Sequence, residues 1–125
     1  MLLMTTGVAK AVEARDARGH SVDVSPITRL LDSIVAKWHP HQVWLFGSRA
    51  RGQANASSDW DLFAVVPDDV PDDELDAIVS WRLRKESGTR ADVVPCHLAD
   101  FREDHDTPNT IAYEVAHEGV LIYER

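Results

Sequence analysis

The feature that most constrains the fold is the run "LFAVV" at residues 62–66, which contains no polar side chain. Side chains alternate between the two faces of a β-strand, so a strand of this composition is apolar on both faces. Such a strand belongs in the middle of a sheet that helices cover on both sides. Yet it is preceded by "DWD" at residues 59–61, and burying a carboxylate without a partner is costly. Either water or a cation must therefore reach these two acids.

Three further apolar runs predict the other strands of this sheet. They read "QVWLFG", "RADVVPCH" and "VLIYE", at residues 42–47, 90–97 and 120–124. Each run contains β-branched or aromatic residues, which favour strands, and glycine or charged residues bound the runs.

Segments with helical spacing precede the first strand and separate the later ones, and the first two strands follow each other directly. The clearest runs from Ser25, expected as the cap, through Pro26 to Trp38, with its apolar residues on one face. A helix is also expected over 71–87, where acids in the first turn and bases in the last match the helix dipole. Residues 8–18 and the segment between Thr107, expected as a cap, and Gly119 are further candidates, and 101–106 is expected to be a polar connection. This order predicts an α/β (α+β) fold: a small mixed β-sheet with flanking helices.

Composition limits the class of protein. The 125 residues, 44% of them hydrophobic, suit one domain with one core. A net charge of -8 argues against direct nucleic-acid binding, which usually needs a basic surface. Cys96 is the single cysteine and is expected to be a small buried residue, and no segment resembles a membrane span or a leader peptide, so a soluble, cytoplasmic protein is expected. The tryptophans are expected at core-facing positions or beside the acids, with core packing favoured: Trp38, Trp44, Trp60 and Trp81.

The acids at the start of the central strand indicate a cation site. Asp59 and Asp61 point to one face and Trp60 to the other. Asp92 begins the next predicted strand and can reach the same place if that strand lies alongside. Mg²⁺ prefers oxygen ligands together with substrate phosphates, and carboxylates around one or two ions are typical of phosphoryl transfer. The alternative is a set of solvated acids at turns and strand starts.

A glycine-serine turn follows the first strand. Gly47 allows a close approach of the backbone to a phosphate, and the hydroxyl of Ser48 with the backbone N–H groups after it can bind phosphate oxygens. Arg49 and Arg51 follow and could neutralise a triphosphate, although surface solubility or salt bridging is an equal explanation for them.

These motifs together resemble a known signature. Gly47-Ser48, ten residues, then Asp59-x-Asp61 resembles the DNA polymerase β-like nucleotidyltransferase superfamily. The wording "GSRARG", the small size, Asp92 and the ending "IAYEVAHEGVLIYE" are similar to its minimal nucleotidyltransferase branch. The resemblance covers residues 25–125, which are predicted to be the minimal nucleotidyltransferase domain, and leaves 1–24 as an N-terminal extension of uncertain role.

The resemblance implies a role for each residue of the motif. Gly47 and Ser48 would hold the phosphates of the nucleotide, and Asp59 and Asp61 would bind Mg²⁺. Asp92 would complete the metal site and help to deprotonate the acceptor hydroxyl. The acceptor would then attack the α-phosphate of a nucleoside triphosphate, ATP in the leading interpretation, and pyrophosphate would leave.

The minimal branch is associated with helical HEPN proteins, often as toxin and antitoxin, and this implies a partner. The leading hypothesis is transfer of AMP to a tyrosine hydroxyl of a HEPN RNase toxin, which neutralises it. One alternative is an antitoxin that only masks the surface of its partner. Another is transfer to the hydroxyl of a small molecule, which the absence of room for an acceptor domain disfavours.

Overall fold

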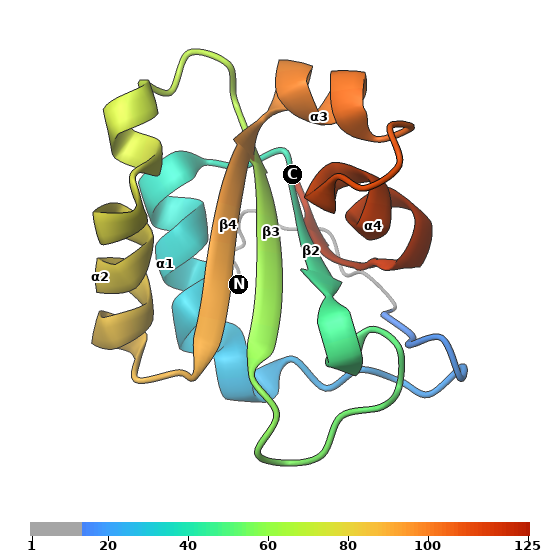
Figure 1. Cartoon of the computed structure of the whole chain (residues 1–125). Helices are drawn as coiled ribbons and strands as arrows, with labels where there is room; N and C mark the ends of the chain where they lie inside the picture. The colour runs from blue at the N-terminus through green and yellow to red at the C-terminus, as the bar shows by residue number, and fades with distance from the viewer. Residues whose placement is uncertain (1–13) are drawn as a thin grey trace.

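The computed structural model describes residues 14–125 (Figure 1). Three single 3-10 turns accompany its helices and strands: η1 (Ser25–Ile27), η2 (Gly47–Arg49) and η3 (Asp72–Leu75). In chain order, the helices and strands are α1 (Thr28–Trp38), β2 (Gln42–Phe46), β3 (Trp60–Val66), α2 (Ala77–Ser87), β4 (Ala91–His97), α3 (Leu98–Asp104), α4 (Ile111–Glu118) and β5 (Val120–Glu124).

The strands form one mixed sheet in the order β4-β3-β2-β5. β2 runs antiparallel to both β3 and β5, whereas β3 and β4 are parallel and are connected through α2. Helices α1 and α2 pack on one face of the sheet, and α3 and α4 pack on the other (Figure 1). The predicted fold class is confirmed, and the run at 62–66 occupies an interior strand as its composition predicts.

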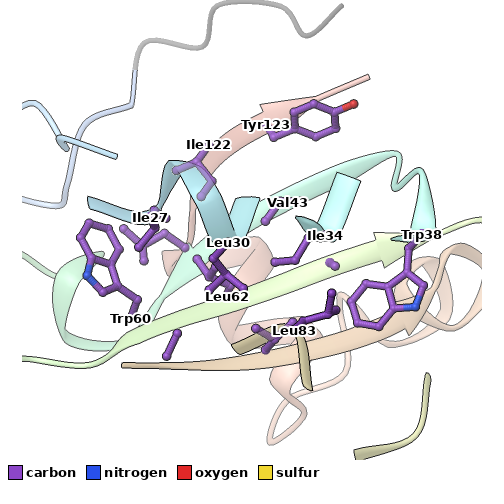
Figure 2. Packing of buried hydrophobic residues seen from close by; sticks show 14 of the residues in the cluster. Ile27, Leu30, Ile34, Trp38, Val43, Trp60, Leu62, Leu83, Ile122 and Tyr123 are labelled. Atoms are coloured by element: carbon purple, nitrogen blue, oxygen red, sulfur yellow. The ribbon is translucent and has the colours of Figure 1, made fainter. Parts of the chain in front are cut away.

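Alternate side chains of β3 enter two separate cores. Leu62, Ala64 and Val66 join the larger core with α1 and α2, which Figure 2 shows from Trp60 at one end to Trp38 at the other. Phe63 and Val65 join a smaller core against α3 and α4. Each fully buried side chain of this size stabilises the fold by about 1.5–3 kcal/mol, so β3 is firmly held from both faces.

Helix α1 has the predicted apolar face, but its start differs from the prediction. Ile27, Leu30, Ile34 and Trp38 are buried in the larger core. Ser25 makes no side-chain cap, because Ser25 lies inside η1, one turn before the α-helix begins at Thr28.

The helix predicted over 71–87 is two elements. Asp76 adopts an extended conformation (φ -62°, ψ 150°) that ends η3. Asp76 is also the residue directly before α2. The acids of 72–74 therefore lie in η3, whereas the predicted bases in the last turn and the predicted end at residue 87 are confirmed. Gly88, in a left-handed conformation, ends the helix.

The predictions for 101–106 and for Thr107 are wrong. Residues 98–104 form α3, whose Leu98 and Phe101 pack against the smaller core. Two apolar residues in a helix of seven are too few to give a clear helical period in the sequence. The helix is stabilised by packing against the sheet and not by its own sequence. The cap of α4 is Thr110, whose hydroxyl accepts a hydrogen bond of 3.0 Å from the Tyr113 N–H.

The first described residues form a turn instead of the expected helix. The part of that expectation at 8–13 lies outside the described residues. Arg15 forms an antiparallel bridge with Ser21, and the Asp16 carboxylate accepts hydrogen bonds from the N–H groups of Arg18 and His20 at 2.9 and 3.0 Å. An Asp side chain that satisfies nearby backbone in this way competes with a helix. Residues 14–24 pack against the larger core through Ala14, Val22 and Val24.

Candidate functional site

The parallel pairing of β3 and β4 places Asp61 directly opposite Asp92. Asp61 is also paired with Phe46, the last residue of β2, so it lies where β2 gives way to the glycine-serine turn. Both aspartates line an open cavity of about 560 Å³ whose walls include residues of α2 and α4. The condition set by the sequence, that the third strand lie beside the second, is met.

Gly47 connects the glycine-serine turn to the acids physically. Its φ of +74° is in the left-handed region, which L side chains rarely adopt. A Cβ at this position would overlap the Oδ2 atom of Asp61 far inside van der Waals contact. The backbone conformation thus favours glycine here, and a larger residue would force the Asp61 carboxylate to move, so the two halves of the sequence motif are in direct contact.

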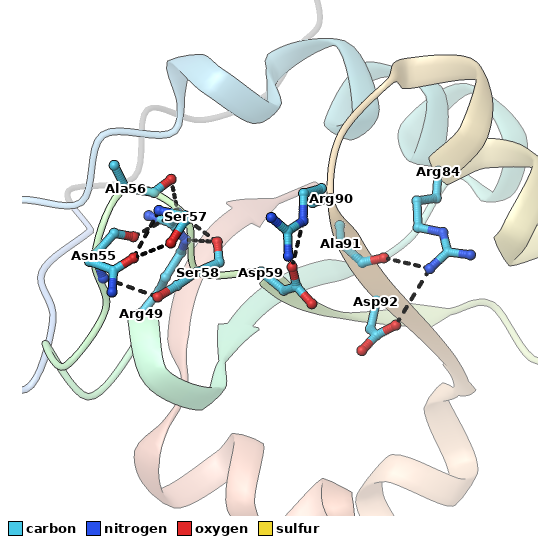
Figure 3. A network of polar contacts seen from close by, with 10 residues as sticks. All are labelled: Arg49, Asn55, Ala56, Ser57, Ser58, Asp59, Arg84, Arg90, Ala91 and Asp92. Atoms are coloured by element: carbon cyan, nitrogen blue, oxygen red, sulfur yellow. Dashed lines mark hydrogen bonds and ion pairs between the residues drawn. The ribbon is translucent and has the colours of Figure 1, made fainter.

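The other two aspartates each lie beside an arginine (Figure 3). Asp59, just before β3, has its Oδ1 at 3.2 Å from Nε of Arg90. Asp92 has its Oδ1 at 3.9 Å from Nη1 of Arg84, which also donates a hydrogen bond to the Ala91 carbonyl. These side chains are 53% and 68% exposed for Asp59 and Asp92, so both pairs are solvated and weak.

Asp61 carries the electrostatic strain of the site. Burial raises the pKa of its carboxyl first, and the negative charges of Asp92, Asp59 and Glu114 raise it further, while Arg51 lowers it. Asp92, Asp59 and Glu114 therefore lie close enough to Asp61 for their charges to act on its carboxylate at this end of the sheet. A cation that offset this repulsion would be favoured here.

Glu114 is the acid that the sequence analysis missed. It lies in the first turn of α4, the helix that covers this face of the sheet. Acids are common in a first helical turn for reasons of the helix dipole alone, so its position in the sequence gave no signal of proximity to Asp61.

The two arginines of the turn have different surroundings. The Arg49 guanidinium donates to the carbonyls of Ser58, Asn55 and Ala56, with a shortest distance of 2.7 Å (Figure 3). It also lies 4.1 Å from the centre of the Trp60 ring. It therefore ties the 53–58 loop to the start of β3. Arg51 donates to Gln53 at 3.1 Å and is the arginine whose charge reaches Asp61.

Ser48 is the second residue of η2, and its carbonyl accepts a 2.9 Å hydrogen bond from the Gln53 N–H. The turn that carries it is thus closed by the backbone as well as by Arg49.

The chemistry of the acids fits a hard divalent cation. Carboxylate oxygens are the ligands that Mg²⁺ takes, and the pKa of Asp61 is raised by burial first and then by the negative charges around it. Within residues 14–125, however, the side chains as they stand bring together no three acids, histidines or cysteines closely enough to hold a metal ion. Two of the predicted ligands, Asp59 and Asp92, lie beside Arg90 and Arg84 instead.

Two expectations outside the acids have different outcomes. Cys96 is half-buried, and burial raises the pKa of its thiol to about 11, so it is protonated at neutral pH. Of the tryptophans, Trp38 and Trp60 are buried, but Trp81 on α2 is 42% exposed and lines the cavity of Asp61 and Asp92. Core packing is therefore wrong for Trp81.

Comparison with known protein families agrees with the superfamily that the sequence motif predicts. The profile of the family described as polymerase beta, nucleotidyltransferase, matches residues 30–125. The chain therefore belongs to this nucleotidyltransferase family, and the superfamily predicted from the sequence is confirmed. No curated protein sequence matches it.

Two solved structures share the fold at low identity. One is a candidate nucleotidyltransferase from Sulfolobus solfataricus, with a TM-score of 0.55 and 16% identity over 82% of this chain and 80% of that one. The other is a toxin-antitoxin with AMP-PNP, with a TM-score of 0.55 and 21% identity over 83% of this chain and 75% of that one. Among the helices of residues 14–125, none has the length and apolar character needed to cross a membrane.

Proposed function

We propose that this chain is a Mg²⁺-dependent nucleotidyltransferase that transfers AMP from ATP to a tyrosine hydroxyl of a HEPN-type toxin and so acts as its antitoxin. The observation that carries the proposal is the placement of Asp61 opposite Asp92 and against Gly47, at the mouth of an open cavity. This arrangement brings the glycine-serine turn and paired carboxylates to one end of the sheet.

The proposed reaction is a single displacement at phosphorus. The hydroxyl oxygen of the acceptor forms a bond to the α-phosphorus of ATP, and the bond from that phosphorus to the bridging oxygen breaks. Pyrophosphate leaves with the bridging oxygen. The hydroxyl proton passes to Asp92, the exposed carboxylate of the pair, which faces the open cavity.

Asp59, Asp61 and Asp92 are the proposed ligands of Mg²⁺. Bound Mg²⁺ would supply charge stabilisation to the phosphate oxygens during transfer. Before these aspartates could bind an ion, the ion pair between Asp59 and Arg90 and the ion pair between Asp92 and Arg84 would have to separate. Both pairs are solvated, so separating them costs little.

Gly47 and Ser48 are the proposed contacts for the nucleotide phosphates. Of the two arginines, Arg51 is the better candidate for neutralising them, because Arg49 is held by the loop carbonyls and the Trp60 ring. Arg49 acts indirectly by keeping the turn in place.

A protein acceptor is supported by the comparisons. The structural neighbour at 21% identity is a toxin-antitoxin with AMP-PNP, which supports both an adenine nucleotide and a toxin partner here. Neutralisation by surface masking remains the alternative, favoured by the exposed apolar side chains of Trp81 and Ile111.

The mass of the partner tests the proposal. The HEPN-type protein that is co-expressed and co-purified with this chain is incubated with Mg-ATP, and its intact mass is measured. We expect a gain of one AMP per modified tyrosine with the natural chain and a rate lower by about 100-fold or more with Asp59→Asn. Asp32→Asn, which removes the same charge from an exposed position on α1, is the control and should match the natural chain.

Two outcomes contradict the proposal in different ways. No mass gain with the natural chain excludes AMP transfer. Full neutralisation of the toxin by Asp59→Asn, without modification, means that masking is sufficient and that the chemistry is dispensable.

A further inference from the structure

The outer edge of β4 is a free strand edge next to the acids. β4 pairs only with β3 in the described sheet. The Trp60 N–H donates to the Arg90 carbonyl at 3.0 Å, so the backbone groups of Arg90 face β3. Every second residue of a strand faces the same neighbour, so the backbone groups of Ala91, Val93 and Pro95 face away from β3. Arg84 takes the Ala91 carbonyl, whereas among residues 14–125 no hydrogen bond reaches the N–H or carbonyl of Val93.

Exposed apolar side chains stand on both sides of this edge. The large apolar residues that are most exposed in the described chain are Ile78, Trp81 and Ile111, at 51%, 42% and 48%. Trp81 from α2 and Ile111 from α4 line the cavity that runs along β4, together with Asp61 and Asp92. Single exposed apolar residues are ordinary, but two that flank an unpaired strand edge indicate a surface that another molecule covers.

The far end of the same cavity is strongly acidic. Leu75 lines the cavity there, within a segment, residues 68–76, that contains six acids and no base. Asp72 and Asp100 lie 3.8 and 4.0 Å from Nδ1 of His97, the last residue of β4. A second copy of this chain would bring like charges together at this edge, whereas a basic segment of another protein would be attracted to it.

We propose that the acceptor protein docks here as an extended segment that adds a short strand to the outer edge of β4 (the β4 groove: Ala91, Val93, Pro95, Trp81 and Ile111). Its backbone pairs with the N–H and carbonyl of Val93, and its apolar side chains lie between Trp81 and Ile111. Basic residues at one end of the segment face Asp72 and Asp100. A hydroxyl-bearing residue at the other end faces Asp61 and Asp92. This inference rests on the proposed transfer to a partner protein and names where that partner binds.

Pro95 limits and aligns the added strand. Proline has no N–H, and within sheets it is confined to positions that face away from a neighbouring strand or to bulges. Ala91 and Val93 are therefore the outward donors of β4 before Pro95 interrupts the edge. Strands rise about 3.3 Å per residue, so the basic residues of the segment must be about five positions from its hydroxyl residue to span from Asp92 to His97.

The affinity of the partner tests the groove. Calorimetry measures the Kd of the HEPN-type partner for the natural chain and for Trp81→Asp and Ile111→Asp, which lie on different helices. We expect each variant to weaken binding by about 10-fold or more. Ile78→Asp is the matched control: it places the same charge at an exposed apolar position of α2 that does not line the cavity, and it should change Kd by less than about 2-fold. Unchanged binding by both groove variants would overturn the inference.

Amide hydrogen exchange tests the strand pairing without any substitution. Exchange at the Val93 N–H should be fast in the free protein and at least about 10-fold slower in the complex, while the Ile78 N–H is unchanged. Binding that depends on Trp81 but leaves the Val93 N–H unprotected would overturn strand addition.

The outcomes separate this inference from the proposed function. If groove variants lose the partner but the natural chain never transfers AMP, docking at the β4 groove stands and the catalytic proposal fails. If the natural chain modifies the partner and the groove variants bind and modify it equally well, the catalytic proposal stands and this inference fails.

Discussion

The two ends of β3 are built for opposite purposes. From Leu62 to Val66 the side chains are at most 2% exposed and alternate between two apolar cores. At the other end, Asp61 shares the strand start with Asp59 and faces Asp92 across the register, and burial, followed by the charges of the neighbouring acids, raises its carboxyl pKa. One strand thus joins a fully satisfied interior to a site that is electrostatically unfavourable in the absence of a ligand.

The difference teaches how this fold can carry an unfavourable site. A rigid, well-packed strand fixes the position of Asp61, so the acids cannot simply move apart. The stability of the core tolerates the repulsion, which a bound cation or positively charged group would relieve. Variants at the two ends should therefore change the free energy of unfolding in opposite directions.

The largest effect is expected from the apolar end. Leu62→Ala removes a fully buried side chain and should lower the free energy of unfolding by about 2–5 kcal/mol, since the surrounding core cannot collapse fully into the space. Urea denaturation measures it. Leu121→Ala on β5, where the side chain is half-buried, is the control and should cost less. Equal costs would mean that β3 is not the centre of stability.

An intermediate effect is expected where the acids meet the glycine turn. Gly47→Ala adds a Cβ at a positive φ and against the Asp61 carboxylate, whereas Gly88→Ala adds one at nearly the same φ (+72°) with nothing within 4 Å. We expect Gly88→Ala to cost about 1–2 kcal/mol and Gly47→Ala measurably more by urea denaturation. In an Asp61→Ala background the excess at position 47 should disappear. An excess that persists there would show that the carboxylate is not its cause.

The smallest effect, of opposite sign, is expected from the acid itself. The raised pKa of Asp61, caused by burial and then by Asp92, Asp59 and Glu114, disfavours its ionised form in the folded state. The protonated Asp61 carboxyl makes its full contribution to stability below its pKa in the unfolded chain. This contribution is lost as the pH rises through its raised pKa in the folded protein. Asp61→Asn should therefore raise Tm slightly at pH 7 without divalent ions, and the difference should vanish near pH 3.

A second measurement sharpens this prediction. Mg-ATP should raise the Tm of the natural chain, because a ligand that binds the folded form stabilises it, and should leave Asp61→Asn nearly unchanged. Asp32→Asn should behave as the natural chain in both series. If Asp61→Asn without ligand is less stable than the natural chain at pH 7, the prediction is contradicted. The negative charge of Asp61 would then already be offset by positive groups in the folded protein.

The central part of the fold is predictable because its signals are local. The composition of residues 62–66 is enough to expect an interior strand, and β-strand alternation alone puts Asp59 and Asp61 on one face. The nearness of Asp92 could be stated only as a condition, since the strand order is set by tertiary packing. The structure supplies that condition through the parallel register of β3 and β4.

The remaining features depend on contacts between distant segments. Glu114 reaches the acids because α4 lies over that face, and Arg49 is drawn away from the cavity by the loop carbonyls. Helix α3 forms with two apolar contacts, fewer than any periodicity can detect. Trp81 is expected in the core because tryptophan is usually buried, yet the structure leaves its side chain on the surface.

The fit of Gly47 against Asp61 also restricts how descendants of this chain can diverge. An asparagine tolerates a left-handed backbone, but here its Cβ would meet the carboxylate. Replacement of the glycine therefore costs less once position 61 has lost its acid, because no carboxylate then has to move. A lineage with a shortened residue at 61 and an asparagine at 47 would show that this contact between the two halves of the motif is lost, whereas glycine alone at 47 would not show whether the acid is kept.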